Sequence, residues 1–262
     1  MNSLLEPVAG AVTGFIVGLT GVGGGALMTP ILLLFFGIAP HTAIGTDLWF
    51  AAITKIAIAT VHRGNGTIDW LVLRRLWLGS LPASAATTLW IRAISVEAGS
   101  TALLQRAIAV AVVLTAIGLI VQAPLRRRAD RRYPEFAEKY ANWQAPATVL
   151  AGALLGVIVT LTSVGAGALG AVMLVYLYPT RLSPPRLIAT DVAHAIPLAI
   201  FAGLGHLLAG GVDGRLLGSL LLGSIPAGVI AGSLSARMPH AAVRGALSLV
   251  LVVVGLKLAG AW

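Results

Sequence analysis

The chain has 262 residues, of which 58% are hydrophobic and only 10% are charged. Soluble globular domains carry about 25% charged residues, so this composition excludes an ordinary soluble protein and indicates a membrane protein. The net charge is +9, yet the basic residues stand mostly in short segments between long apolar runs. That distribution is typical of membrane topology and argues against nucleic-acid binding.

Several kinds of site are excluded by what the sequence lacks. It contains no cysteine, so it has no disulfide framework and no thiolate metal site. It has no Gly-x-x-x-x-Gly-Lys-Ser/Thr phosphate loop, so nothing indicates ATP as an energy source. We therefore expect no cofactor and no metal. The first ten residues carry Glu6 and no basic residue, so we also expect no cleaved signal peptide.

The sequence is internally duplicated. "LTGVGGGAL" (residues 19–27) matches "LTSVGAGAL" (161–169) at seven of nine positions. Two further pairs of motifs follow, both at a separation of 144 residues: "IGTD" (44–47) with "IATD" (188–191), and "LGSLPA" (78–83) with "LGSIPA" (222–227). A shared order and spacing indicates two related halves.

Each half contains a glycine-broken helical hairpin followed by three longer helices, which predicts an all-α polytopic membrane protein. The hairpin arms reach roughly 18–22 Å at about 1.5 Å per residue, too short for a hydrocarbon core of about 30 Å. The first repeat, 1–124, is predicted to hold the hairpin 8–37 and helices 43–61, 71–91 and 103–123. A basic loop, 125–146, precedes the second repeat, 147–262, with the hairpin 147–178 and helices 187–205, 214–235 and 241–261.

The orientation follows from the basic residues. The loop 125–146 holds six Lys and Arg residues, which places it in the cytoplasm; thirteen of the 18 basic residues then lie on that side. The first half then begins outside and the second begins inside, so we expect two inverted-topology repeats. Inverted repeats with broken helices are a recurring plan of secondary transporters, which bind substrate near the membrane midplane.

The hairpin tips are the predicted substrate site, because a broken helix frees backbone N–H groups and the new helix directs its positive end at the tip. That arrangement suits a small anion. The alternative role for glycines here is close helix packing, as in the ladder Gly10, Gly14 and Gly18. The predicted substrate-binding residues are Thr20, Gly21, Gly23, Gly24, Gly25, Thr162, Ser163, Gly165, Gly167 and Lys55.

Asp47 and Asp191 are repeat mates and the only acidic residues within the predicted spans. An intramembrane carboxylate is costly and points to a function such as proton transfer. The alternative is that each caps the start of its own helix, since Ser, Thr, Asp and Asn are favoured caps. Both interpretations stay open at this level.

Lys55 has no counterpart, since Ala199 occupies the matching position. A lysine deep in a span is expected to pair with a carboxylate, here Asp47, or to supply charge to an anion. His194 follows Asp191 by three residues and shares its helix face. A hydrogen-bonded core histidine is the favoured interpretation, with proton coupling as the alternative.

The paired motifs "GLTGVGGGALMTPIL" and "TLTSVGAGALGAVML", the "IGTD" and "IATD" starts and the repeated "LGSxPA" resemble the TauE/SafE sulfite exporter family. This family is also called the 4-toluene sulfonate uptake permease family. The resemblance covers nearly the whole chain and implies a multi-pass secondary transporter of the bacterial inner membrane, with sulfite, sulfoacetate or other organosulfonates as substrate. The second half differs from the first at its tip, where Ser163 replaces Gly21 and Ala166 replaces Gly24, so we expect the two tips to contribute unequally.

The functional hypothesis is therefore alternating-access transport of a small anion, with a small anion and the lipid bilayer as partners and no nucleic acid. No feature of the sequence sets an oligomeric state. A passive anion channel is an alternative. A second alternative, an intramembrane hydrolase using Ser163 and His194, is disfavoured because Gly21 and Phe50 occupy the repeat positions, and we expect no enzymatic activity.

Overall fold

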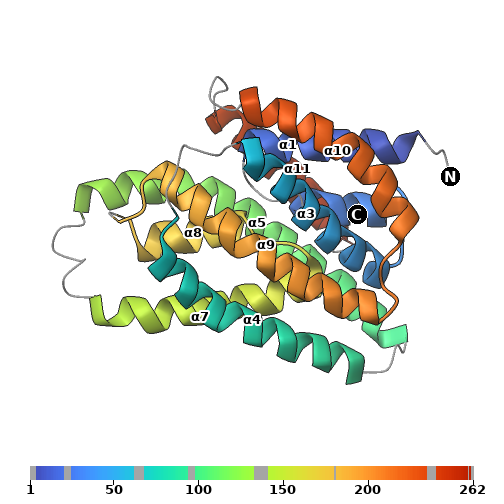
Figure 1. The fold of residues 1–262 in the computed structure, drawn as a ribbon, viewed down its shortest axis with the longest axis horizontal. Coiled ribbons are helices and arrows are strands. Elements are labelled where there is room, and N and C mark those ends of the chain that lie inside the picture. Colours follow the sequence, from blue (N-terminus) through green and yellow to red (C-terminus); the bar gives the residue numbers. More distant parts are fainter. Residues whose placement is uncertain are drawn as a thin grey trace.

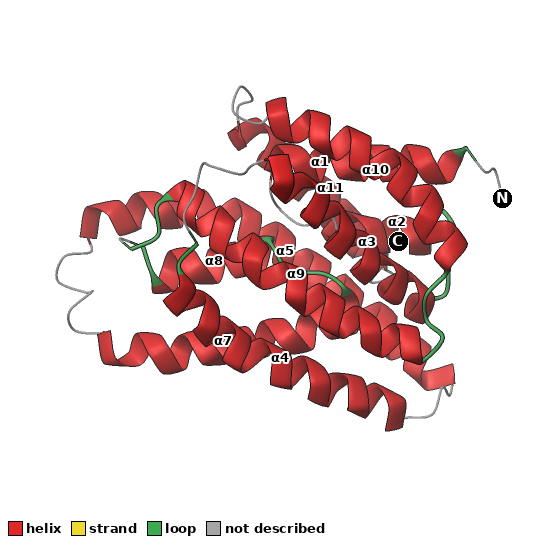
Figure 2. Ribbon diagram, viewed as in Figure 1, coloured by secondary structure: helices red, strands yellow, loops and turns green. Residues whose placement is uncertain are grey.

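The computed structural model describes residues 4–20, 25–61, 68–93, 98–132, 141–179, 181–234, 240–258 and 260. In these segments the regular structure is entirely helical, without a strand (Figure 2). The predicted all-α class is confirmed. The first half holds α1 (Leu5–Thr20), α2 (Gly25–Leu34), α3 (Pro40–Val61), α4 (Trp70–Ala93) and α5 (Ala98–Arg132), and the second holds α7 (Ala141–Thr162), α8 (Ala168–Leu177), α9 (Pro184–Leu208), α10 (Gly214–Leu234) and α11 (His240–Leu258).

Five of the described helices are long and apolar enough to cross a membrane: α3, α5, α7, α9 and α10. The surface supports this, because large apolar side chains face outward. Leu78 and Leu222, which are repeat mates, are 68% and 75% exposed, whereas Asp47 and His194 are fully buried. A protein that exposes leucine and buries charge matches lipid as its solvent.

Two helix lengths differ from the prediction. α7 has 22 residues, about 33 Å at about 1.5 Å per residue, so the expectation that this hairpin arm is too short to span is wrong. α5 has 35 residues and runs to Arg132, well into the segment predicted as a loop. Arginine is a good helix former, so a helix can continue beyond the apolar run that starts it.

The helices pack in pairs that join the two halves (Figure 1). α1 lies along α10 and α4 lies along α7, while α3 packs against α9 and α5 against α11. Exchanging the halves converts the first pair into the second and leaves the other two unchanged. The packing is thus related by exchange of the repeats.

Glycines make these crossings close. A methyl group at Gly10 would collide with the backbone of Leu220, and one at its mate Gly152 would collide with the backbone of Leu76. Leu220 and Leu76 are themselves mates, 144 residues apart. The same relation holds for Gly14 on Ser224 and Gly156 on Ser80. A methyl group at Gly18, the third member of the predicted ladder, would likewise collide with the backbone of Gly228. The packing interpretation of the ladder is therefore confirmed, and close approach of this kind is what small residues permit between membrane helices.

Candidate functional site

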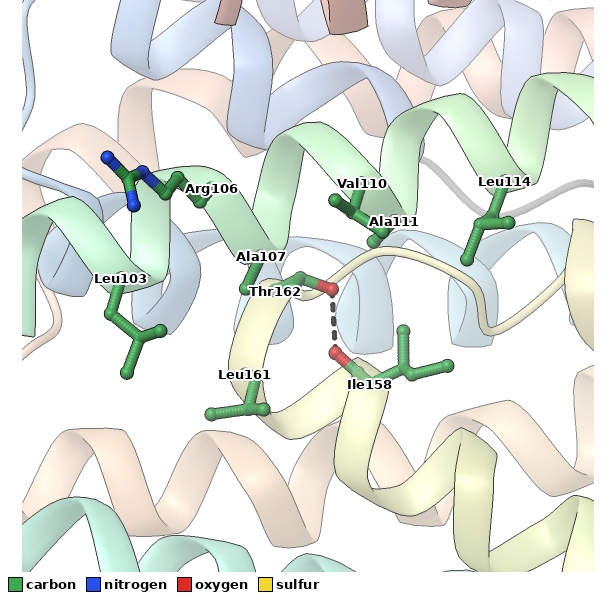
Figure 3. A pocket seen from close by; sticks show the side chains of 9 residues that line it. All are labelled: Leu103, Arg106, Ala107, Val110, Ala111, Leu114, Ile158, Leu161 and Thr162. Atoms are coloured by element: carbon green, nitrogen blue, oxygen red, sulfur yellow. Dashed lines mark hydrogen bonds between the residues drawn. The ribbon is translucent and has the colours of Figure 1, made fainter. Parts of the chain in front are cut away.

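The second hairpin breaks after α7 because of a local hydroxyl contact. Thr162 Oγ1 donates to the carbonyl of Ile158 (2.6 Å), a bond drawn in Figure 3, and accepts the N–H of Val164 (3.1 Å). The hydroxyl thereby satisfies groups that the helix end leaves free. In this state the Thr162 hydroxyl hydrogen is engaged within its own turn and not offered to a substrate.

The turn that follows depends on positive backbone angles. Ser163 has φ 59°, Gly165 has φ 112° and Gly167 has φ 151°. Glycine adopts these conformations without a Cβ penalty, but a serine there is uncommon. The N–H of Gly167 donates to the Gly165 carbonyl (2.8 Å), so the tip is an ordered turn.

α8 begins directly at this turn. Its N-cap is Gly167, and no side chain hydrogen-bonds to the first turn of the helix. The first N–H groups of a helix carry the positive end of its dipole and bind anions readily. The tip therefore holds the uncapped, positive end of α8.

Ser163 from the second half meets Asp47 from the first. The Ser163 hydroxyl is buried and faces the Asp47 carboxylate, yet neither Ser163 Oγ nor Asp47 Oδ1 completes a hydrogen bond within the described residues. A buried polar atom without a partner is costly and marks a place where a ligand or water is expected.

Lys55 reaches the same tip from α3. Its Nζ donates to the carbonyl of Ala166 (2.7 Å), and the side chain is buried. The Lys55 charge acts electrostatically on both Asp47 and Asp191, but within the described residues no ion pair joins it to either carboxylate. Lys55 thus lies between the second tip and the two intramembrane acids.

Asp47 is anchored to another helix. Its Oδ2 accepts the backbone N–H of Thr29 (3.2 Å) and the Thr29 hydroxyl, which lie in α2. The interpretation that Asp47 caps its own helix is wrong, because α3 already begins at Pro40. Proline is favoured in the first turn of a helix, and α3 accordingly begins at Pro40, about two turns before Asp47.

Asp191 lacks the equivalent anchor. α9 begins at Pro184, so Asp191 also lies inside its helix and does not cap it. The position that corresponds to Thr29 is Ala171, which has no hydroxyl. Asp191 Oδ1 is buried without a hydrogen-bond partner in the described part of the chain, packed where a methyl group at Gly170 would stand.

His194 is held by a neighbouring helix. Its Nε2 forms a hydrogen bond with Ser80 Oγ on α4 (3.0 Å), and the ring is fully buried. This contact favours the core-histidine interpretation. Because the Ser163 hydroxyl has no hydrogen-bond partner within the described residues, they hold no nucleophile–base contact between Ser163 and His194.

The first tip is described only at its edges. Thr20 donates its hydroxyl to the carbonyl of Ile16 (2.7 Å), and Gly25 is the first residue of α2. The predictions for Gly21, Gly23 and Gly24 lie outside the described residues.

Two reciprocal contacts between the halves were not expected from the sequence. The N–H of Asp69 donates to Thr190 Oγ1, and the N–H of Asp213 donates to Thr46 Oγ1, both at 3.0 Å. Both acids also accept, through Oδ1, the N–H three residues later, so each is an N-cap, of α4 and α10 respectively. The repeated Thr-Asp of "GTD" and "ATD" can be seen in the sequence. The sequence does not show which residue each threonine binds.

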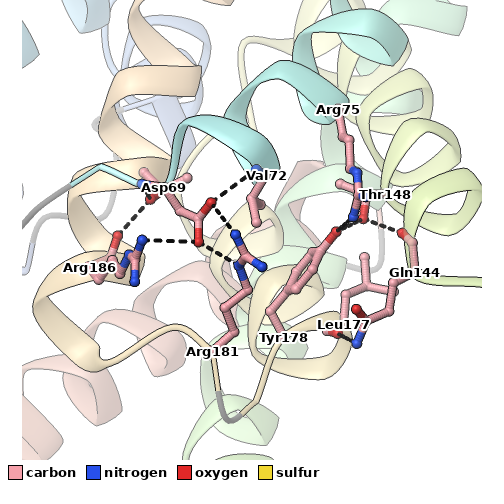
Figure 4. Close-up of polar contacts among 10 residues, drawn as sticks. Asp69, Val72, Arg75, Gln144, Thr148, Leu177, Tyr178, Arg181 and Arg186 are labelled. Atoms are coloured by element: carbon pink, nitrogen blue, oxygen red, sulfur yellow. Dashed lines mark hydrogen bonds and ion pairs between the residues drawn. The ribbon is translucent and has the colours of Figure 1, made fainter. Parts of the chain in front are cut away.

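An ion-pair cluster lies at one of these contacts and is shown in Figure 4. Asp69 accepts hydrogen bonds from Arg181 (2.6 and 3.1 Å) and pairs with Arg186 (3.4 Å). The hydrogen-bonded Arg181 guanidinium holds the pKa of Asp69 below its usual value. The residues 144 positions before the two arginines are Gly37 and Thr42. The contact at Asp213 therefore has no matching arginines.

A second polar contact in Figure 4 ties the other end of the hairpin to α4. The Tyr178 hydroxyl accepts from Arg75 (3.0 Å) and shares a hydrogen bond with Thr148 (2.7 Å). Tyr178 ends α8, Arg75 belongs to α4 and Thr148 to α7. Both arms of the second hairpin are thereby held to the first half.

An apolar groove of about 300 Å³ opens between α5 and the end of α7 (Figure 3). Leucine, valine, isoleucine and alanine form most of its lining, with Arg106 and Thr162 among them. Such a lining suits a lipid chain and not a small anion. The groove borders the second tip but offers few polar groups to an anion.

The chain is similar to several probable membrane transporter proteins. YjnA of Bacillus subtilis (strain 168), a probable membrane transporter protein, is 36% identical over 205 residues, covering 78% of this chain and 79% of the relative. YdhB of the same strain, also a probable membrane transporter protein, is 26% identical over 211 residues and 78% of each chain. A probable membrane transporter protein of Haemophilus influenzae is 36% identical over 80 residues, or 28% of this chain and 30% of the relative.

No solved structure matches the chain. The sulfite exporter TauE/SafE family matches residues 7–258, nearly the full length. With its apolar spans and its transporter relatives, this multi-pass membrane protein is a transporter rather than an enzyme. The chain belongs to the sulfite exporter TauE/SafE family.

Proposed function

We propose that this protein is a secondary transporter that moves small sulfur-containing anions, such as sulfite, sulfoacetate or other organosulfonates, across the bacterial inner membrane by alternating access coupled to protons. The family description supports a sulfite-type substrate. The observation that carries the proposal is the second tip, where an uncapped helix start, a buried free hydroxyl and a lysine come together.

The substrate oxyanion would bind at the start of α8. Its oxygens would accept the N–H groups of Ala168 and Leu169 and the hydroxyl of Ser163, which has no other partner in the described residues. Lys55 supplies positive charge one residue away from the N-cap, through its contact with Ala166. A sulfonate or sulfite offers three oxygens, which matches a site built from several separate donors.

Inverted repeats and alternating access are supported by the reciprocal contacts. In the predicted orientation, Thr46 and Asp213 both lie at the outer face, whereas Thr190 and Asp69 both lie at the cytoplasmic face. Each contact thus joins two helix ends that the predicted topology places on the same side of the membrane. In this scheme the pairs of Asp69 with Arg181 and Arg186 hold the cytoplasmic end closed, and residues 125–146 lie in the cytoplasm.

Reconstitution into proteoliposomes tests the proposal. We expect saturable uptake of labelled sulfite or an organosulfonate, stimulated by a pH gradient and by substrate loaded on the opposite side. Ser163→Ala should raise KM for the anion because it removes one donor. Absence of any dependence on sulfite, organosulfonates or the pH gradient would overturn the proposal.

The same assay separates the carrier from a passive channel. Stimulation by substrate on the opposite side requires a site that alternates between faces, and a channel does not show it. The hydrolase alternative is opposed by the contact of His194 with Ser80 in place of Ser163.

A further inference from the structure

The two intramembrane carboxylates occupy equivalent positions but have unlike surroundings. Asp47 accepts two hydrogen bonds from Thr29, one from the backbone and one from the hydroxyl. Asp191 has no hydrogen bond from the described residues, although it too is buried. The sequence explains the missing hydroxyl donor, since the second half carries Ala171 where the first carries Thr29. The N–H of Ala171 donates to the Gly167 carbonyl instead (3.0 Å).

Hydrogen bonds to a carboxylate favour its ionised form, whereas burial without donors favours its neutral form. The contacts of Asp47 with Thr29 tie α3 to α2. Asp191 has no such contacts to lose when it binds a proton and none to regain when it releases one. A proton on Asp47 would weaken the carboxyl group as an acceptor for Thr29, whereas Asp191 can gain or lose a proton without changing any hydrogen bond between helices in the described residues.

The charges around Asp191 are few. α9 packs against α3, α4, α7 and α8. The described residues of α7 and α8 carry no charged side chain. α4 carries Arg74, Arg75 and Arg92, of which Arg75 is engaged with Tyr178, and Lys55 is the charged group that acts on Asp191. From α3, Lys55 acts on Asp191 and also on Asp47. His194, on the same helix, is bonded to Ser80. The local group thus consists of two acids and one lysine, with one negative charge in excess when all three are ionised.

We propose that Asp191 is the proton-carrying group of the transport cycle, with Lys55 as its charge partner, and that Asp47 is a positioning residue. This rests on the proposed proton-coupled transport. When Asp191 is ionised, its negative charge offsets the positive charge of Lys55. When a proton neutralises Asp191, the charge of Lys55 is free to attract an anion at the second tip. One proton and one anion would then bind together and cross together, and release of the proton from Asp191 would favour release of the anion.

The test compares two variants by a ratio that cancels differences in protein amount. The ratio is uptake driven by a pH gradient divided by counterflow of labelled sulfite at equal pH on both sides. In Asp191→Asn the ratio should fall at least tenfold, because counterflow needs no release of the proton. In Asp47→Asn it should stay within twofold of wild type, even if less folded protein is recovered. If Asp47→Asn does not fold, Thr29→Val replaces it, with the same expectation.

A third variant adds the missing donor. Ala171→Ser places a hydroxyl where the first half has Thr29, and the gradient-driven uptake should then require a more acidic outer solution. The inference is overturned if Asp191→Asn keeps the wild-type ratio, or if Asp47→Asn or Thr29→Val loses it. Wild-type counterflow without any effect of a pH gradient would also overturn it while leaving anion transport intact. Absence of both activities in wild type would instead refute the proposed function.

Discussion

Replacing Gly79 of α4 by alanine tests whether the close helix crossings set the stability of the fold. A Cβ at Gly79 would stand 2.7 Å from the backbone nitrogen of Ala153 and closer still to the carbonyl oxygen of Val149. Ordinary contacts begin at about 3.4 Å, so α4 and α7 must separate by about 0.7 Å to clear the Ala153 nitrogen and by more to clear the Val149 oxygen. Because both obstructing atoms belong to the backbone, no side-chain rotation can relieve the overlap.

The expected magnitude follows from two opposing terms. Overpacking costs about 1–3 kcal/mol, and a rigid backbone contact belongs to the upper part of that range. Alanine regains about 1 kcal/mol of helix propensity over glycine. The net loss should be about 1–2 kcal/mol, a decrease in Tm of roughly 2–8 °C for a chain of this size.

Thermal unfolding of the purified protein in detergent provides the assay. Gly223→Ala, the repeat mate, should lose a similar amount, because its Cβ would meet the backbone of Pro7 and Ala11. Gly218→Ala is the matched control on the same helix as Gly223; nothing lies within 4 Å of its Cβ, so it should be neutral or slightly stabilising. Equal Tm values for all three variants and wild type would refute the packing argument.

Three further outcomes are expected. Thr29→Val should lower the unfolding free energy by about 1–3 kcal/mol because Asp47 loses a hydroxyl donor, whereas Thr115→Val, which removes a buried hydroxyl without a partner in the described residues, should cost little; equal losses in chemical denaturation would contradict this. Because Arg181 lowers the pKa of Asp69 below 3.8, Asp69 stabilises the fold above that pH and loses this contribution as the pH falls through its lowered pKa. Asp69→Asn should therefore show a smaller decrease in Tm between about pH 5 and pH 3 than wild type, and an unchanged decrease would count against the ion pair. Since the chain has no native cysteine, single cysteines at residues 98 and 128, near the two ends of α5, should react with impermeant reagents from opposite sides of the membrane; labelling from one side alone would refute the orientation.

The sequence alone was sufficient for the fold class and for the sites of several local features. The excess of apolar residues predicts membrane helices, because only helices or closed barrels satisfy their backbone in lipid. The motif "LTSVGAG" predicts a helix break, which the structure has between Thr162 and Ala168. Asp69 and Asp213 each stand directly before an apolar run, where an acid binds the first N–H groups of the helix that follows, as both do here. These features depend on neighbours within a few residues, so they can be predicted from the sequence.

The tertiary structure decided which distant groups meet. Nothing in the order of residues brings Lys55 to the carbonyl of Ala166, 111 positions away, or assigns Thr29 to Asp47. The ends of two helices also differ from the prediction. α7 is long enough to span the membrane, and α3 begins at Pro40, so that Asp47 lies inside the helix and does not cap it. The repeat predicted two equivalent acids, whereas packing left Asp47 bonded and Asp191 free of hydrogen bonds within the described residues. The physical reason is that sequence periodicity states which face of a helix is buried, but the partner of a buried polar group is set by which helix the fold places against that face.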